Sequence, residues 1–302
     1  MASSSDAQAM FWDRTSDGLP TKVFQFIRRW PILPLIVLAM LVICGVFANQ
    51  IAPHDPLSAN IRARNVPPAW DAQGSFDHLL GTDQQGRDLL SRVIHGARIS
   101  LIVAFTVLII AGFLGVLLGM LAGYFGGWID EGIMRVMDLQ LAVPFLLVAL
   151  VVVIVVGQSF EIVVLLLAVN AWSNYARLVR AETMQIRTTD YVSLAVVAGA
   201  STRRILAKHI LPGVMNTVLV VATLQVGSLI LAESILSFLG AGIPPPTPAW
   251  GLMVSDGRTY LATAWWVAFF PGMAIFLTVF AFNFLGDWLR DKLDPRLRQL
   301  SD

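Results

Sequence analysis

Acidic, basic and imidazole side chains alternate in one short stretch of this chain, and they form its densest group of chemically active residues. Asp83, Asp88 and His95 are residue types that bind divalent metal ions. Arg87 and Arg92 are interleaved with them, and their positive charges would oppose a bound cation. We therefore reject a metal site made from these three residues. If the stretch is helical, Asp88 and Arg92 lie four residues apart on one face, which predicts an ion pair between them.

The other residues that could do chemistry are scattered. Glu233 lies in an apolar stretch, with Gln225 about two helical turns before it. A carboxylate in such surroundings is costly and usually faces a bundle interior or an aqueous path, so it could line a conduit or bind water or a neighbouring helix near the end of its span. His54, His78 and His209 have no partner at a spacing that suits metal binding or catalysis, so we expect no metal site. The chain also has no Gly-rich phosphate loop that ends in Lys-Ser or Lys-Thr.

The composition is that of a membrane protein. Of 302 residues, 56% are hydrophobic and only 14% are charged, and the mean hydropathy is +0.71. A soluble domain of this length would need far more polar surface. The net charge of +1 gives no support to nucleic-acid binding. The only cysteine, Cys44, lies in an apolar run, so an intrachain disulfide is impossible and packing is its expected role.

Six apolar runs predict an all-α integral membrane protein with six transmembrane helices. Basic residues concentrate in the N-terminal region, in one internal loop and in the tail, which places both termini in the cytoplasm. The predicted spans are residues 31–52, 99–123, 139–156, 162–176, 214–239 and 261–285. The predicted division is a cytoplasmic tail (residues 1–30), a first span (31–52), a periplasmic segment (53–98), a core of five spans (99–289) and a second cytoplasmic tail (290–302).

The internal basic loop, residues 177–213, separates the fourth and fifth predicted spans. Six arginines and lysines face only two acidic residues, and this excess places the loop in the cytoplasm. Leu194, Ala195 and Ala198 would form a small apolar face that suits a groove on a partner protein. The alternative is an amphipathic hairpin that lies on anionic lipid, and the spacing leaves both interpretations open.

Two short helices are predicted within the basic loop. Asp190 can cap a helix over residues 191–198. Gly199 can end that helix, because glycine tolerates the left-handed backbone of a chain reversal. A second helix, residues 201–211, would end at Pro212.

Two further patterns have mainly structural interpretations. Gly115, Gly119 and Gly123 recur every four residues on one face of the second predicted span. Without side chains there, another helix can approach closely, so we predict a helix–helix contact at these glycines. An interfacial ion network is expected beside the next loop, formed by Asp130, Glu131, Arg135 and Asp138.

The basic loop also resembles the coupling loop of ABC-importer permeases. The residues that carry this resemblance are Asp190, Tyr191, Val192, Ala195, Gly199, Ala200, Ser201, His209, Ile210, Leu211 and Pro212. Residues 81–101 resemble the signature of one branch, the second membrane subunit of dipeptide, oligopeptide, glutathione and nickel importers. Further matches to that branch are residues 236–240, 245–251, 283–287, 289–291 and 293–296. The resemblance covers about residues 20 to 300.

The resemblance implies the type I ABC importer architecture, in which the helix before the glycine sits in a cleft of an ATP-hydrolysing subunit. ATP closes two such subunits, and the loops transmit this movement to the membrane helices. The coupling loops of this family often have a glutamate where this chain has Ser193. Asp190 and the basic residues would have to compensate for the missing charged contact with the ATPase. The residues implied in ATPase coupling are Asp190, Tyr191, Ser193, Leu194, Ala195, Ala198, Gly199, Ala200, Ser201, Arg203 and Arg204.

The resemblance also implies partners. They are a related but different permease chain, one or two kinds of ABC ATPase that bind ATP and Mg, and a periplasmic or lipid-anchored substrate-binding protein, in the bacterial inner membrane. This chain would then be neither an enzyme nor a cofactor protein. Peptides are the expected substrates, with glutathione, opines, nickel chelates and sugars left open. Two roles are open for Asp83, Arg87, Asp88 and Arg92. They could form a surface that receives the binding protein and gates the outer mouth, or they could form only a capped and salt-bridged helix.

Two alternatives come from other functional classes. A self-contained secondary transporter or channel would be expected to show internal duplication or more ionisable groups within the membrane, and the sequence shows neither. A membrane-embedded enzyme would need converging catalytic residues, and the predicted spans offer little beyond Glu233. Uptake that depends on ATP rather than on an ion gradient would separate the importer from both.

Overall fold

The computed structural model describes residues 31–293 of the chain. The regular structure in this part is helical, apart from one isolated bridge between Thr82 and Asp88. The predicted N-terminal tail, and the tail residues from 294 on, lie outside the described residues.

Four helices are long and apolar enough to cross a membrane. These are α5 (Leu89–Phe125), α8 (Phe160–Arg187), the continuous helix Thr202–Phe238 that contains α11 (Leu211–Phe238), and α13 (Trp266–Leu293). A fifth span is possible if α6 (Gly127–Ala142) and α7 (Phe145–Val156) are counted together. The all-α membrane class is therefore confirmed, with four or five clear spans rather than six. The remaining apolar helix, α3 (Ile32–Val46), has only 15 residues.

The third predicted span is not one straight helix. The structure bends it by 81° between α6 and α7. Pro144 stands directly before α7, and a proline there has no N–H to continue the hydrogen-bond ladder of α6. The expected uninterrupted helix at residues 139–156 was wrong for this reason.

Pro212 does not break the helix as Pro144 does. The loop helix that was predicted to end at Pro212 continues through this residue. The chain runs from α10 (Thr202–Ile205) through a π-helical turn at Leu206–Ile210 into α11. Pro212 lies at the first positions of α11, and the wider turn before it accommodates the missing donor. The second loop helix and the fifth span are thus one continuous element.

The glycine contact predicted within the second span is confirmed, and its partner is α8. A Cβ atom added at Gly115, Gly119 or Gly123 would lie 2.5 to 2.6 Å from backbone oxygens of Trp172, Ala176 and Arg180. Only glycine allows this approach, so α5 and α8 pack backbone to backbone along their C-terminal halves.

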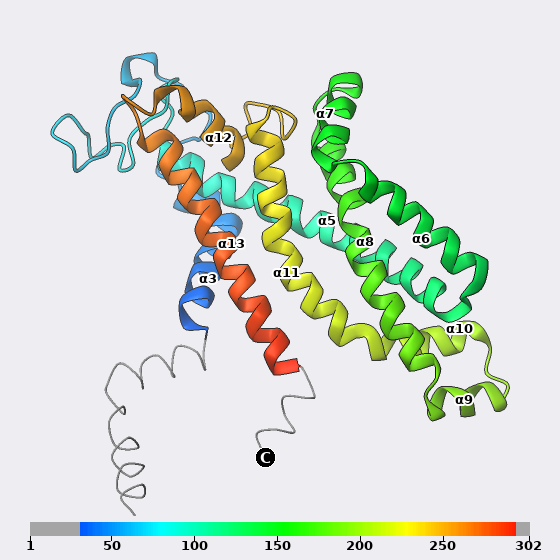
Figure 1. The fold of residues 1–302 in the computed structure, drawn as a ribbon. Helices are drawn as coiled ribbons and strands as arrows, with labels where there is room; N and C mark the ends of the chain where they lie inside the picture. The colour runs from blue at the N-terminus through cyan, green and yellow to red at the C-terminus, as the bar shows by residue number, and fades with distance from the viewer. Residues whose placement is uncertain (1–30, 294–302) are drawn as a thin grey trace, which may run out of the picture.

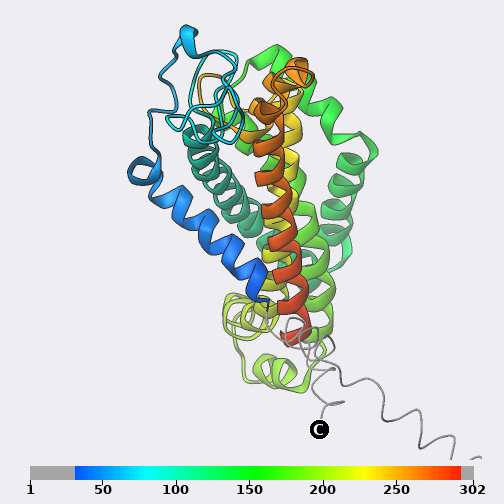
Figure 2. The same ribbon diagram turned by 90° about the vertical axis from the view of Figure 1, so that its left-hand side faces the viewer.

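The short helix α3 leans against α5 and α13 (Figure 2). Arg98 on α5 fixes it, since its Nε donates to the carbonyl oxygen of Gly45 at 2.8 Å and its Nη1 to Asn49 Oδ1 at 3.0 Å. Asn49 belongs to the one-turn helix α4 (Ala48–Ile51) that continues α3. The outer end of the first predicted span is thereby held to the start of the second.

The remaining elements lie at opposite ends of the helix bundle (Figure 1). The outer segment, residues 53–88, and α12 (Trp250–Gly257) are at one end, and α9 (Asp190–Val197) and α10 are at the other. Single turns at Ile61–Ala63 and Arg258–Tyr260 complete the outer end. Trp266 Nε1 donates to the Thr82 carbonyl oxygen at 3.1 Å and Trp250 Nε1 to that of Val93 at 2.9 Å, which join this end together.

Candidate functional site

The short helix α9 is a separate element at one end of the molecule (Figure 1). The structure begins it at Asp190, with Thr189 as the residue before it, so Asp190 lies in the first turn instead of capping the helix as predicted. Gly199 has φ +77°, which is the predicted left-handed residue after the helix. The predicted helix–glycine–helix arrangement is confirmed, with this change in the cap.

One side chain anchors α9 to the rest of the molecule. Val192 is 1% exposed and packs in a cluster with Val179 of α8, with Ile205 and Ile210 that follow α9, and with Val214 of α11. The Tyr191 ring adds a second contact, since its centroid lies 6.2 Å from that of His209. His209 therefore packs against the loop's own helices, as expected.

The opposite face of α9 is apolar and open. Leu194 is 68% exposed and Val197 is 86% exposed, and Tyr191 and Val196 are about half exposed. A helix of eight residues that buries one valine and exposes four large apolar side chains needs a further contact surface. Ala198 is exposed as well, and Ala195 is partly buried.

Polar residues of the predicted coupling set surround this face. Asp190, Ser193, Gly199, Ser201, Arg203 and Arg204 are exposed, and Ala200 is partly buried. Among residues 31–293, neither Arg203 nor Arg204 forms an ion pair. Two open arginines beside an apolar helix suit an acidic rim on a partner.

The helix before α9 is braced on two sides, which sequence reasoning missed. Arg180 of α8 pairs with Asp130 of α6, with its Nη2 at 2.6 Å from Asp130 Oδ2. Arg187, in the last turn of α8, donates to the carbonyl oxygen of Tyr124 on α5 at 2.6 Å. A force on α9 would thus reach α5, α6 and α8 together.

The predicted ion network on α6 is only partly present. Arg135 Nη2 lies 3.0 Å from Glu131 Oε1, as an exposed pair one helical turn apart. Asp130 turns to Arg180 instead, and Asp138 has no ion pair within the described part of the chain.

At the outer end, the predicted ion pair between Asp88 and Arg92 is wrong. The helix begins at Leu89, and Asp88 caps it by accepting from the backbone N–H of Ser91 at 2.8 Å. Arg92 lies 3.5 Å from the carboxylate of Asp83 instead, and Arg87 donates to the same carboxylate at 2.6 Å. Because Asp88 is used as the cap, it forms no ion pair with Arg92.

All four of these outer residues are buried. Asp83, Arg87, Asp88 and Arg92 are each at most 5% exposed. They hold the outer segment together, and in this conformation a protein that docks from outside would touch the loops around them rather than these side chains. The capped, salt-bridged helix is thus the arrangement that the structure has, with Asp83 as the acidic partner.

The expectation for two of the histidines also needs correction. His78 Nδ1 lies 2.9 Å from Asp88 Oδ1, and His54 Nδ1 lies 3.8 Å from the same atom. The three residues come from distant positions in an irregular segment, so no spacing in the sequence revealed their meeting.

Glu233 is enclosed within the helix bundle. It is 1% exposed and accepts a hydrogen bond from Ser237 Oγ at 2.6 Å. Gln225 is only partly buried, and Asn174 of α8 approaches it at 3.5 Å. The two residues predicted to lie on one path therefore have different surroundings.

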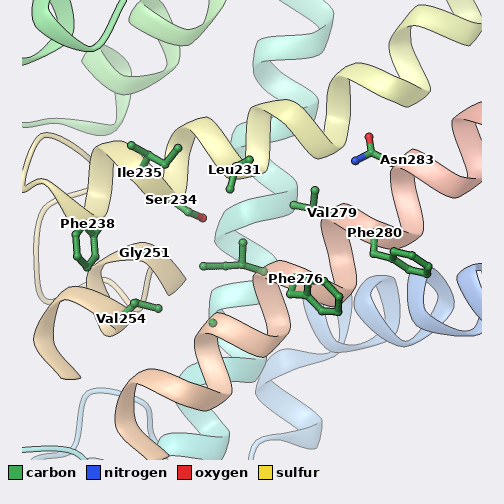
Figure 3. Close-up of a pocket in the computed structure, with 12 residues that line it drawn as sticks. Leu231, Ser234, Ile235, Phe238, Gly251, Val254, Phe276, Val279, Phe280 and Asn283 are labelled. Carbon is green, nitrogen blue, oxygen red and sulfur yellow. The ribbon is translucent and has the colours of Figure 1, made fainter. Parts of the chain in front are cut away.

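An apolar cavity of about 580 Å³ lies between α11, α12 and α13 (Figure 3). Leu231, Ile235 and Phe276 line it, and Ser234 and Asn283 are its polar side chains (Figure 3). Neither Glu233 nor Gln225 is among its lining residues.

Comparisons with known proteins agree with the membrane spans. Residues 115–299 match the family described as "Binding-protein-dependent transport system inner membrane component". The chain is 43% identical to a di/tripeptide transport system permease protein of Pseudomonas aeruginosa, over 87% of both chains. It is 46% identical to a dipeptide transport system permease protein of Escherichia coli K12, over 90% of this chain and 91% of the relative.

A third relative comes from Bacillus subtilis. The dipeptide transport system permease protein of Bacillus subtilis is 41% identical over 88% of this chain and 81% of its own. The similarity thus extends over nearly the whole length of the chain, well beyond the matched family region. The chain belongs to the family of binding-protein-dependent transport system inner membrane components, and it is a non-catalytic subunit of the inner membrane.

Proposed function

We propose that this chain is a transmembrane subunit of an ABC importer of dipeptides and short oligopeptides. The observation that carries the proposal is α9, a braced helix with an open apolar face at the end of the bundle opposite the outer segment. The relatives supply the substrate class, since each is named as a dipeptide or di/tripeptide permease.

We propose that α9 docks into a cleft of an ATPase subunit, with Leu194 and Val197 as its apolar contacts. The other coupling residues would then form the rim, with Arg203 and Arg204 facing acidic groups. Ser193 stands where the resemblance leads one to expect a glutamate, so these two arginines and Asp190 would supply the charged contacts. ATP and Mg would be bound by the ATPase subunits alone.

We propose six spans in the membrane, with both termini in the cytoplasm. The sixth would be α3 together with α4, which extends it by one turn. Arg98 holds this pair to α5, so a short helix would be stabilised by protein contacts. Because six spans are few for a closed conduit, a related permease chain would supply the other half.

A substrate path that involves α11 is part of the proposal. Gln225 is partly exposed and could meet a peptide, whereas Glu233 would reach the path only if α11 moved during the cycle. Replacing Glu233 by Gln keeps an acceptor for Ser237. Slower uptake by this variant in a normally assembled complex would support the path, and unchanged uptake would remove Glu233 from it.

The outer segment would meet a substrate-binding protein through its exposed loops. We propose that Asp83, Arg87, Asp88 and Arg92 position these loops from within. The contact would then depend on their ion pairs rather than on direct recognition.

The test of this function is uptake by the reconstituted complex. The chain, its partner permease, the ATPase subunits and the binding protein are placed in proteoliposomes, and entry of a labelled dipeptide is measured. Uptake should require ATP hydrolysis and should stop when residues 190–211 are replaced by a flexible linker. Uptake driven by an ion gradient without ATP would contradict the proposal.

A further inference from the structure

Two imidazoles and one carboxylate converge on the outer face of the protein. The potential ligand atoms of His54, His78 and Asp88 all lie within 4.8 Å of one another. His78 Nδ1 is 2.9 Å and His54 Nδ1 is 3.8 Å from Asp88 Oδ1. All three belong to the outer segment, where His54 follows α4, His78 lies further along and Asp88 caps α5.

The two oxygens of Asp88 have separate partners. Oδ2 accepts from the Ser91 N–H at 2.8 Å and from the Ser91 hydroxyl at 2.7 Å. This leaves Oδ1 directed at the histidines. The backbone N–H of His54 donates to the same hydroxyl at 3.0 Å. One serine therefore orients the carboxylate and positions one of the imidazoles, which is how outer residues commonly support metal ligands.

The arginines that argued against a cation in this stretch are engaged elsewhere. Arg87 and Arg92 both approach the carboxylate of Asp83. His95 is not a further ligand, since its two ring nitrogens lie at hydrogen-bond distance from Ser91 and Asn49. The cluster thus offers two imidazoles and one carboxylate whose side chain is only 1% exposed.

We propose that His54, His78 and Asp88 form a binding site for a divalent transition metal of the zinc class. In tetrahedral zinc sites, ligand bonds of about 2.0 to 2.1 Å place neighbouring ligand atoms about 3.3 Å apart. The observed separations of 2.9 and 3.8 Å from Asp88 Oδ1 lie on either side of this value. Imidazole nitrogens favour zinc, nickel or cobalt over magnesium and calcium, which prefer oxygen ligands.

The metal would join three segments of the outer end. It would tie the chain that leaves the first membrane helix to the start of α5 and to the outer segment. The His54 side chain is 42% exposed, so the metal's remaining position is open to water or to an external ligand. The unfolded chain does not hold the three ligands close together, so the metal would bind the folded protein and stabilise this end.

The test uses the assembled importer, purified through a tag without histidines. After treatment with a chelator and dialysis against zinc, bound zinc is counted by elemental analysis. His54→Gln removes one ligand at an exposed position, and His95→Gln is the matched control in the same region. We expect His54→Gln to lose about one zinc ion per chain relative to the wild type, and His95→Gln to lose none.

A second measurement does not depend on counting metal in the partner subunits. Zinc should raise the unfolding temperature of the wild-type complex but not that of His54→Gln, and an excess of magnesium should not replace it. Equal zinc content and equal thermal response in wild type and His54→Gln would overturn the proposal, leaving only a hydrogen-bonded histidine–aspartate cluster.

Discussion

Gly115, Gly119 and Gly123 give α5 a strip without side chains, and carbonyl oxygens of α8 lie directly against it. At this scale, the periodicity of the glycines was enough to predict a close contact, although the sequence did not reveal the partner helix. Gly112 on the same helix does not share this close contact. A Cβ atom added there would have only Tyr175 Cε1 nearby, at 4.0 Å.

The first prediction compares two of these glycines. Gly119→Ala would place a methyl group 2.6 Å from the Ala176 oxygen and 2.9 Å from Val179 Cβ. Because both helices must shift, we expect a loss of about 1 to 3 kcal/mol in stability, measured as a lower unfolding temperature of the complex. Gly112→Ala is the control and should change little. Equal stability of the two variants would show that the α5–α8 contact does not limit stability.

The second prediction concerns the brace behind α9. Asp130→Asn removes the charge partner of Arg180, at a site where both side chains are partly buried. A partly buried ion pair of this kind contributes on the order of 1 kcal/mol, and its loss should loosen α8 from α6. We expect reduced peptide uptake per ATP hydrolysed, with recovery in the exchanged pair Asp130→Arg with Arg180→Asp. Failure of the exchanged pair to recover any coupling would argue against this brace.

Charged residues were the hardest to place from the sequence. The rule for residues four apart predicted that Asp88 pairs with Arg92, but the start of the helix at Leu89 made Asp88 a cap. Asp83 instead forms ion pairs with both Arg87 and Arg92. A change of a few residues in where a helix begins is enough to change every partner, and sequence patterns define helix ends poorly.

Among the elements, α9 shows what local sequence determines. A short helix-forming stretch followed closely by a glycine with positive φ is a short-range pattern, and the structure has the helix within one residue of its predicted bounds. The two prolines depend on longer-range packing. Pro144 breaks a span, whereas Pro212 is accommodated next to a π turn, and no property of the prolines themselves distinguishes the two cases.

The third prediction tests the open face of α9. Leu194→Glu places a carboxylate where an apolar contact is proposed, at a side chain that is 68% exposed and so not needed for folding. Loss of one buried leucine contact is worth about 1.5 to 3 kcal/mol, so ATPase subunits should bind roughly 10- to 100-fold more weakly. Gln185→Glu, which adds the same group on α8, is the control. Normal ATPase affinity of Leu194→Glu would exclude Leu194 from the interface.

For the whole molecule, the arrangement places a compact outer end and an open inner end on one helix bundle (Figure 1). The outer end is fixed by buried ion pairs and by two tryptophan N–H donors. The inner end presents α9 on a base formed by α5, α6 and α8. This asymmetry suits a subunit that receives movement at one end and opens or closes a passage toward the other.

The class of the chain and its membrane character could be predicted from composition alone, because apolar runs long enough to span a bilayer are unambiguous. The number of spans was less secure. The bent pair α6–α7 and the 15-residue α3 both deviate from a straight span of full length. Hydropathy reveals neither the break at Pro144 nor the hydrogen bonds by which Arg98 holds α3 and α4 to α5.

The most direct test of the account is a cross-link from α9 in the assembled importer. With Cys44 replaced by alanine, a cysteine at Leu194 should cross-link to an ATPase subunit, whereas a cysteine at Glu131 should not. The ATPase should also protect the α9 cysteine from a water-soluble maleimide. A cysteine at Leu194 that reacts freely in the complete, transport-active complex and forms no cross-link would contradict the proposal that α9 couples this chain to an ATPase.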